Sequence, residues 1–387
     1  MPPADHEGVS LYVHVPVCAR ACPYCDFDFV VDRRPDVSAL LAAYRREVAA
    51  RRLFGIRPRT VYVGGGTPSA LGLAGLSALL SALGAWFDLG GVEESTVEVN
   101  PEHADDRLFE ALARGGVDRV SLGVQSFQDP VLALLGRVHT GAQARRAVVR
   151  AKSAGLRTSV DLIVGVPGAP AGATRADVRA VADLGPDHVS VYALTVEPDV
   201  PWQALVRRGR RGLPDPDAQA DDLARAHALL ERAGYEHYEV AGYARPGARS
   251  IHNLGYWSWR DYVGIGPSAA SARHEGGGVV RRSNARGLSA YLAGAAPAVE
   301  RLGPEAAARE AMWLGLRRLD GFDRTALARR FGQATTFVDG VLAPLVVSGL
   351  VVRAGPRVRL ASGRWLFHDA AGRAILDPGG VEPEGDR

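Results

Sequence analysis

Six short segments rich in β-branched and apolar residues recur along the first half of the chain, and each ends in small or polar residues. They cover residues 11–15, 60–63, 95–99, 119–124, 158–164 and 188–194. Between them, apolar residues recur at helical spacing over 40–53, 73–86, 106–114 and 142–154. Such alternation predicts a parallel sheet with helices outside it, an α/β fold. Because no further unit of this kind follows residue 200, we expect a partial (β/α)6 barrel rather than a closed eight-stranded one.

The second half of the chain has a different pattern. A helix is expected over about 217–233, followed by the aromatic segment HNLGYW and the Gly-rich run GIGPSAAS. From about residue 304 the pattern reads helix, helix and then short strands, which predicts a smaller α+β, winged-helix-like C-terminal domain. Since 387 residues exceed the usual size of one core, we expect several parts. These are a barrel (1–240), the aromatic segment with a Gly-rich extension (241–300), the C-terminal domain (301–375) and a disordered tail (376–387).

Composition narrows the functional class. The 46 basic and 43 acidic residues give a net charge of only +3, which argues against a nucleic-acid-binding protein. The N-terminus lacks a basic stretch followed by an apolar one, and no eighteen apolar residues run together, so we expect a soluble, cytoplasmic protein, not an integral membrane protein. All three cysteines lie within eight residues, which predicts metal or redox chemistry in a reducing compartment rather than a disulfide framework.

These cysteines, Cys18, Cys22 and Cys25, form a CxxxCxxC motif directly after the first expected strand. Thiolates are the ligands of iron-sulfur clusters, and a 4Fe-4S cube has four irons to satisfy. Because the chain contains no fourth cysteine, one iron would stay open. A structural zinc site with His14 as fourth ligand is one alternative, and three unrelated buried cysteines are another.

The motif, with an aromatic residue before its third cysteine, resembles the signature of the radical S-adenosylmethionine superfamily. The chain is similar to the branch that contains the haem chaperone HemW and the oxygen-independent coproporphyrinogen III dehydrogenase HemN, from Tyr12 into the C-terminal module. The resemblance implies a radical S-adenosylmethionine barrel whose open iron chelates the amine and carboxylate of the methionine. It also implies that a reduced cluster cleaves the sulfonium to a 5'-deoxyadenosyl radical.

The run GGGTP at 64–68 follows the second expected strand. Glycines let backbone N–H groups approach a ligand, so we expect Gly65, Gly66 and Thr67 to contact the methionine end, although such a run also suits a structural tight turn. Glu98 could accept hydrogen bonds from ribose hydroxyls, as acidic residues do in dinucleotide sites. The resemblance implies further cofactor contacts, with an ordinary buried residue or, for Arg137, a helix-surface charge as the alternative. The residues concerned are Gln125, Arg137, Asp161, Tyr12, Tyr24 and Ala193.

The segment from His252 to Trp257 matches an HNxxYW motif that the resemblance associates with haem binding. Imidazole ligates haem iron, and Tyr256 and Trp257 offer flat amphipathic surfaces, although a lone histidine beside aromatic residues is usually a core residue. His139 and His274 are rival ligands.

Three further features bear on whether the chain resembles the chaperones or the dehydrogenases of this branch. Phe27 stands where the dehydrogenases carry another cysteine, and only 17 residues precede Cys18, whereas the dehydrogenases have a longer extension; both favour the chaperone branch. Ala270 stands where many HemW-like chains have a histidine, which counts against it.

Our leading hypothesis is a haem-trafficking protein. It would bind haem covalently or tightly, hold a 4Fe-4S cluster and S-adenosylmethionine, and deliver haem to an acceptor protein such as a respiratory enzyme at the membrane. The second hypothesis is a radical enzyme, either an oxidative decarboxylase of coproporphyrinogen III or a HemN-like methyltransferase or cyclopropanase. The third is a structural barrel that keeps its cluster for folding alone.

Overall fold

Six parallel strands form the centre of the molecule, side by side in chain order, in a computed structural model that describes residues 8–377. They are β1 (Ser10–Val15), β4 (Thr60–Gly65), β5 (Glu94–Val99), β6 (Arg119–Gln125), β7 (Arg157–Val164) and β8 (His188–Ala193). All six coincide with the segments predicted from β-branched residues, to within two residues at each end. The predicted parallel α/β core is therefore confirmed.

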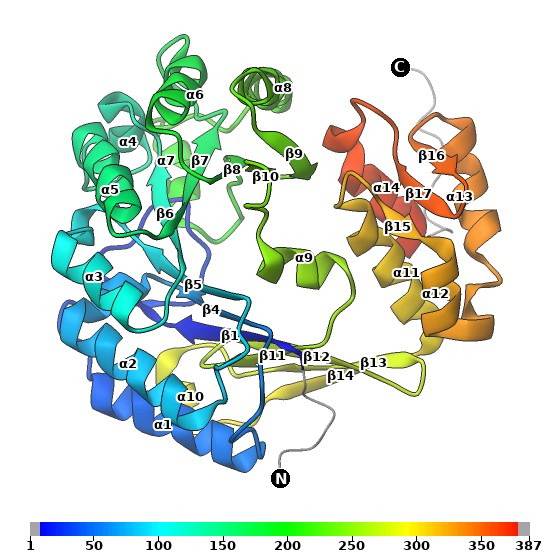
Figure 1. Ribbon diagram of the computed structural model, residues 1–387. Helices are drawn as coiled ribbons and strands as arrows, with labels where there is room; N and C mark the ends of the chain where they lie inside the picture. Colours follow the sequence, from blue (N-terminus) through cyan, green and yellow to red (C-terminus); the bar gives the residue numbers. More distant parts are fainter. Residues whose placement is uncertain (1–7, 378–387) are drawn as a thin grey trace.

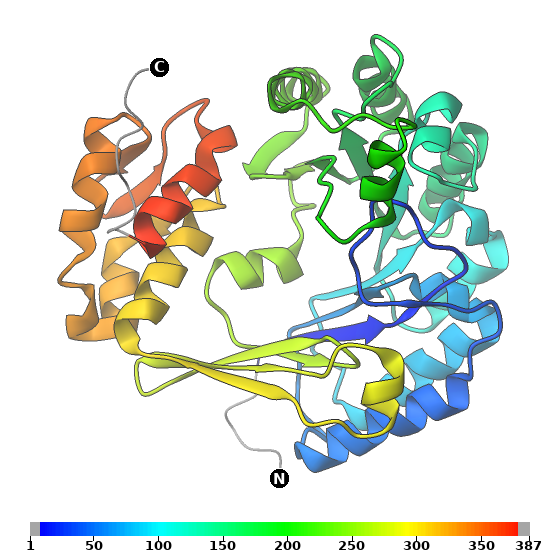
Figure 2. The ribbon, with the colours of Figure 1, turned by 180° about the vertical axis from the view of Figure 1, so that it is seen from behind.

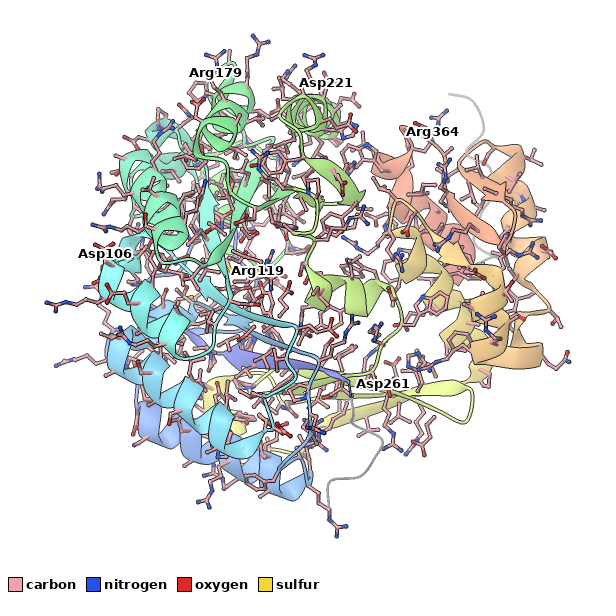
Figure 3. All side chains as sticks on the ribbon, in the orientation of Figure 1. Asp106, Arg119, Arg179, Asp221, Asp261 and Arg364 are labelled. Atoms are coloured by element: carbon pink, nitrogen blue, oxygen red, sulfur yellow. The ribbon has the colours of Figure 1, made fainter. Side chains whose placement is uncertain are left out.

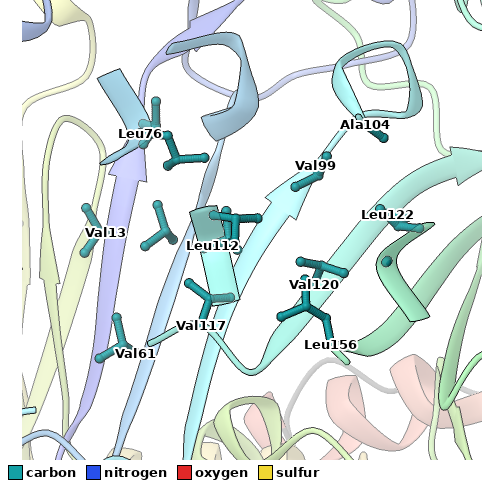
Figure 4. Packing of buried hydrophobic residues seen from close by; sticks show 14 of the residues in the cluster. Val13, Val61, Leu76, Val99, Ala104, Leu112, Val117, Val120, Leu122 and Leu156 are labelled. Carbon is teal, nitrogen blue, oxygen red and sulfur yellow. The ribbon is translucent and has the colours of Figure 1, made fainter. Parts of the chain in front are cut away.

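Helices cover the outer face of these strands (Figure 1). They are α1 (Val37–Ala50), α2 (Gly72–Trp86), α3 (Asp106–Arg114), α4 (Asp129–Leu134), α5 (Gly141–Ser153) and α6 (Ala173–Leu184). Their apolar faces pack on the strands in one hydrophobic core, and Figure 4 shows part of it, including Leu76 and Leu112 from helices and Val61 and Val120 from strands. Residues 68–86, which include α2, are long and apolar enough to cross a membrane by length and composition, a test that core helices also pass.

Further strands extend both edges of the sheet to a total of twelve among the described residues. At the β8 edge lie the antiparallel strands β10 (Gly242–Ala244) and β9 (Glu236–Glu239). At the β1 edge lies β11 (Tyr262–Ile265), parallel to β1, followed by the antiparallel strands β12 (Ala270–Glu275), β13 (Gly278–Ser283) and β14 (Ala298–Leu302). Because β9 and β14 do not pair, the barrel stays open, as predicted.

The remaining elements of the barrel half are short. Strands β2 (Val17–Cys18) and β3 (Val30–Val31) pair in parallel and close the loop that carries the cysteines. The helices are α7 (Pro201–Arg207), α8 (Pro216–Arg232), α9 (Ile251–Trp257) and α10 (Leu288–Leu292), with 3-10 turns at Pro68–Leu71 and Pro101–His103. Helix α9 lies between the barrel and the C-terminal helices, as Figures 1 and 2 show.

The C-terminal part has its own hydrophobic core. It contains α11 (Pro304–Leu316), β15 (Phe322–Asp323), α12 (Arg324–Phe331), α13 (Val338–Val347), β16 (Val351–Ala354), β17 (Arg357–Leu360) and α14 (His368–Leu376), with 3-10 turns at Gly332–Thr335 and Trp365–Phe367. The predicted small C-terminal unit of helices and short strands is confirmed, whereas α14 was not foreseen. The boundaries between the parts stay a prediction, and the tail predicted from residue 376 lies almost wholly outside the described residues.

Candidate functional site

The three cysteines lie in one loop at the carboxyl edge of the parallel strands. Cys18 ends β2 and is buried, whereas Cys22 and Cys25 lie in the connection to β3 and are partly exposed. The N–H of Cys25 donates to the carbonyl oxygen of Cys22 at 3.2 Å, which closes a turn between them. The Sγ of Cys18 lies 3.3 Å from the hydroxyl of Thr67, the residue after the glycine run. The cysteine loop and the glycine turn are therefore in direct contact.

Burial raises the pKa of the Cys18 thiol to about 11, and it also raises the pKa of Cys25. Cysteine thiols must lose their protons to become metal ligands, so binding of a cluster to this loop would release protons. Arg137 is the cation that counters this cost, because its guanidinium donates to the Sγ of Cys22 at 3.4 Å and its charge opposes the rise in pKa at Cys18 and Cys25.

His14 is not free to act as a fourth zinc ligand. Its Nδ1 lies 3.1 Å from the hydroxyl of Tyr12, and its Nε2 lies 2.8 Å from the carbonyl oxygen of Asp28, so both ring nitrogens are engaged. Among residues 8–377, no three His, Cys, Asp or Glu side chains converge on one metal ion. Since zinc needs four ligands on one ion and a cube spreads its ligands over several irons, the three thiols fit the 4Fe-4S cluster better.

The glycine turn is packed so closely that side chains would not fit. A Cβ at Gly65 would lie 2.8 Å from the imidazole of His14, and one at Gly66 would lie 2.6 Å from the carbonyl oxygen of Val17. Gly65 also has a φ of +113°, which favours glycine. The N–H groups of Gly65, Gly66 and Thr67 donate to Glu98, Val15 and Val17, so a ligand here would meet a bare backbone surface without free N–H groups.

A cavity of about 330 Å³ opens beside this turn and holds three of the predicted cofactor residues, Tyr12, Gly65 and Glu98. Glu98 accepts hydrogen bonds from the Tyr62 hydroxyl at 2.8 Å and from the Gly65 N–H at 3.2 Å. Burial outweighs these bonds and raises the pKa of Glu98 to about 7. A carboxyl group at the mouth of this cavity suits the hydroxyls of a ribose, as the sequence suggested.

Sequence reasoning missed four residues that line the same cavity: Asp26, Asp28, Ser268 and Arg286. Asp28 Oδ2 accepts from the Ser268 hydroxyl at 2.7 Å, and Arg286 donates to the carbonyl oxygen of Asp26 at 2.9 Å. These contacts join the cysteine loop to the strands at the far edge of the sheet. No local signal could have found them, because the partners lie more than two hundred residues apart in the chain.

Arg137 is a partly buried residue that follows α4, not a helix-surface charge. Its Nη2 donates to Asn100 Oδ1 at 2.8 Å and to the Gly123 carbonyl oxygen at 3.0 Å, while its Nε is buried and has no hydrogen-bond partner in the described part of the chain. Asn100 in turn donates to the hydroxyl of Thr67 at 3.3 Å. A chain of contacts thus runs from the glycine turn through Asn100 and Arg137 to Cys22. Sequence reasoning missed Asn100, although its place directly after β5 is a signal.

The remaining predicted cofactor residues spread along the strands. Gln125 ends β6 with a φ of +64° and lies close to Arg137 around Gly123. Asp161 on β7 accepts from the Ser121 hydroxyl at 3.1 Å, and burial raises its pKa. Ala193 ends β8, and Tyr24 packs on a small apolar cluster around α4 and α7. None of these four lines the 330 Å³ cavity. Their contacts with S-adenosylmethionine stay a prediction.

The aromatic segment forms α9, and its histidine is buried. His252 Nδ1 lies 2.8 Å from the Thr60 hydroxyl, and its Nε2 lies 2.9 Å from the Tyr256 hydroxyl. Burial, aided by the charge of Arg119 inside the barrel (Figure 3), lowers the pKa of His252 to about 3. Both nitrogens of the neutral ring are therefore in use. Tyr256 and Trp257 instead line an apolar pocket of about 450 Å³ that also includes Tyr12.

Sequence comparison places these features in a known group. The sequence pattern of the radical SAM superfamily matches residues 12–181. The haem chaperone HemW of Lactococcus lactis is 36% identical over 318 residues, which cover 81% of this chain and 82% of that protein. HemW of Mycobacterium tuberculosis is 36% identical over 386 residues, which cover 97% of this chain and 96% of that protein.

A solved structure has the same fold. Coproporphyrinogen III oxidase (HemN) from Escherichia coli superimposes with a TM-score of 0.81 at 24% identity, covering 96% of this chain and 91% of that one. At this identity the likeness concerns the fold alone. The superfamily implies a 4Fe-4S cluster and S-adenosylmethionine, and the cysteine loop and its cavity fit both. On this sequence similarity, the chain belongs to the HemW family of radical SAM proteins.

Proposed function

We propose that this protein is a cytoplasmic haem chaperone that holds a 4Fe-4S cluster and S-adenosylmethionine, binds haem and transfers it to a haem-requiring acceptor protein. The HemW relatives, which match nearly the whole chain, are named haem chaperones. The observation that carries the proposal is the apolar pocket lined by Tyr256 and Trp257, since flat aromatic walls suit a macrocycle. A respiratory enzyme at the membrane is the class of acceptor that we propose.

The cysteine loop would hold the cluster through Cys18, Cys22 and Cys25. When bound, the cluster supplies an open iron for the amine and carboxylate of S-adenosylmethionine. Arg137 would then hold the Cys22 thiolate by its hydrogen bond and reduce the cost of burying negative charge. Glu98 would accept hydrogen bonds from the ribose hydroxyls within the cavity. The glycine turn would let the methionine end lie against the backbone.

Anaerobic reconstitution with iron and sulfide tests the first half of the proposal. The wild-type chain should acquire iron and sulfide in proportion to a 4Fe-4S cluster, and a triple Cys→Ala variant should not. Haemin titration of the same preparation tests the second half, and the expected result is one haem bound per chain. A Trp257→Ala variant should bind haem more weakly, whereas an unchanged haem spectrum and affinity would argue against any part for this segment.

The second candidate function is a radical enzyme, and the cavity beside the cysteines favours it, because Tyr12, Gly65 and Glu98 line it together. Phe27, which is 62% exposed, stands where the dehydrogenases carry a further cysteine, and this favours the chaperone. Anaerobic incubation with dithionite, S-adenosylmethionine and coproporphyrinogen III separates the two. Formation of the vinyl product would overturn the chaperone proposal, and 5'-deoxyadenosine without a porphyrin product would not.

A further inference from the structure

The 450 Å³ pocket lies between the open edge of the barrel and the first C-terminal helix. Its walls come from β1, α9, the residues after α9, β11, β12 and α11, and they include Tyr256, Trp257, Trp259 and Tyr262. The exposed surface of its lining is mostly apolar, and Tyr12 is shared with the cofactor cavity. A volume of this size, with aromatic walls and few polar groups, is typical of a site for a flat organic ligand.

A second hollow of about 520 Å³ adjoins this pocket, because Trp257, Trp259 and Arg260 line both. Its remaining walls carry three more arginines, namely Arg318, Arg330 and Arg357. Those three already face carboxylates at 2.7 to 3.5 Å. Arg260, by contrast, forms no ion pair within 4.0 Å in the described part of the chain, and it lines both hollows. A ligand with an apolar body and carboxylate groups at one edge matches this arrangement.

The three histidines that could ligate haem iron differ in whether a ring nitrogen is free to bind it. His252 uses both ring nitrogens, as described above, and His139 does too, with Glu102 Oε2 at 3.3 Å and the Val124 carbonyl oxygen at 3.0 Å. His274 alone of the three lines the apolar pocket and engages only one nitrogen. Its Nδ1 lies 2.6 Å from Asp261 Oδ1, and its Nε2 has no hydrogen-bond partner among the described residues.

The contact with Asp261 resembles the way in which a carboxylate supports a metal-ligating histidine. A metal-ligating histidine commonly gives its other ring N–H to a carboxylate, which fixes the tautomer and raises the basicity of the ligating nitrogen. Asp261 also accepts from the backbone N–H of His274 at 3.1 Å, so the carboxylate is held in place. Figure 3 shows Asp261 below α9, just before the start of β11.

Strand β12 leaves space for a macrocycle beside this imidazole. Alternate residues of a strand face the same side, and Ala270, Ala272 and His274 all line the pocket. The two alanines have small side chains, so they leave the pocket wall flat beside the histidine. Trp257, which also lines the pocket, has a buried Nε1 without a hydrogen-bond partner among residues 8–377, which is a donor left for a ligand.

We propose that this pocket is the haem site, with His274 as the axial iron ligand, Asp261 as its positioning residue and Arg260 as the partner of a propionate. The proposal rests on the haem-binding function proposed above and names the ligand and pocket for it. It makes His252 a structural residue that orients Tyr256 rather than an iron ligand.

Haemin titration of the anaerobically purified full-length chain tests the proposal by absorbance and electron paramagnetic resonance. A His274→Gly variant should lose the imidazole-ligated ferric spectrum, and added imidazole should restore it by filling the space left. Asp261→Asn should keep haem but weaken its affinity about 10-fold or more, because the ligand loses its orienting carboxylate. Arg260→Glu should weaken binding of haemin more than binding of its dimethyl ester.

Metal-free protoporphyrin IX serves as the folding control, since the His274→Gly variant should still bind it as the wild type does. A His227→Gln variant, on α8 and outside both pockets, should match the wild type throughout. A His274→Gly variant with unchanged spectrum and affinity would overturn the ligand assignment while leaving haem binding in place. A wild-type chain that binds no haemin would instead overturn the proposed function itself.

Discussion

Substitution of Glu98 by glutamine gives a direct test of the electrostatics of the cofactor cavity. Burial raises the pKa of this carboxyl from 4.5 to about 7. The folded protein therefore binds a proton that the unfolded chain releases, so stability falls as pH rises from about 4.5 to 7 and is constant above that range. At about 1.36 kcal/mol per pKa unit, this shift makes the ionised carboxylate cost about 3 kcal/mol at pH 8.5.

Glutamine removes this cost but leaves one acceptor oxygen for the two donors, Tyr62 and Gly65. A lost hydrogen bond of this kind costs about 1 kcal/mol. We expect Glu98→Gln to be more stable than the wild type by about 2 kcal/mol at pH 8.5 and equally stable near pH 5. For a chain of 387 residues, an unfolding entropy of about 2.1 cal/mol/K per residue converts this gain to a rise of about 3 °C in Tm.

Thermal unfolding of the cluster-free chain between pH 5 and pH 8.5 measures this difference. Glu110→Gln is the matched control, because Glu110 is 60% exposed on α3 and its substitution should leave Tm unchanged at every pH. A Tm difference between Glu98→Gln and the wild type that stays the same at both ends of the pH range would refute the reasoning. In the wild type, S-adenosylmethionine should also bind more tightly as pH rises through 7, because the ionised carboxylate is the stronger acceptor.

Other substitutions test the site and the fold. Gly66→Ala places a Cβ against a backbone carbonyl, so it should cost about 1–3 kcal/mol in urea unfolding and lower the iron content after reconstitution. Arg137→Gln removes the donor to Cys22 and should lower iron content with a loss of stability of about 1–3 kcal/mol. His252→Ala should lower Tm, because Thr60 and Tyr256 each lose a hydrogen bond to the imidazole. The spectrum of ferric haem should still be that of an imidazole-ligated iron. Ala270→His should add a second imidazole to the pocket and convert haem to a low-spin form, seen by electron paramagnetic resonance.

The parallel core could be predicted from the sequence because its signals are local. Each strand of the barrel is a run of β-branched residues, and helices α1, α2, α3 and α5 each have an apolar spacing of their own, so both patterns lie within a short window. Helices α4 and α6 were not predicted. The edge strands β11 to β14 escaped prediction because they are short and carry glycine and arginine. Their place in the sheet depends on pairing with β1, which lies some 250 residues earlier in the chain. Only the folded chain shows that pairing.

The candidate site likewise has parts that the sequence predicts and parts that only the folded chain shows. The cysteine loop and the glycine turn are local motifs, and the structure brings them into contact through Cys18 and Thr67. The proposed haem pocket, by contrast, takes its walls from segments between Tyr12 and Leu314, among which only the HNxxYW segment carries a local motif. His274 was one of three candidate histidines in the sequence, and only hydrogen-bond partners could distinguish them.

The HNxxYW motif has a structural explanation that does not require its histidine to touch iron. Glu94 accepts from the N–H groups of Ile251 and His252 at 3.1 and 3.0 Å and so fixes the start of α9 against β5. The imidazole then links Thr60 of β4 to the Tyr256 hydroxyl, one turn further along the helix. Because these bonds set the rotation of α9, they determine that its aromatic face turns toward the pocket. In the proposed haem site the motif therefore acts through the orientation of its aromatic residues on α9, and the proposed ligand to iron, His274, comes from β12.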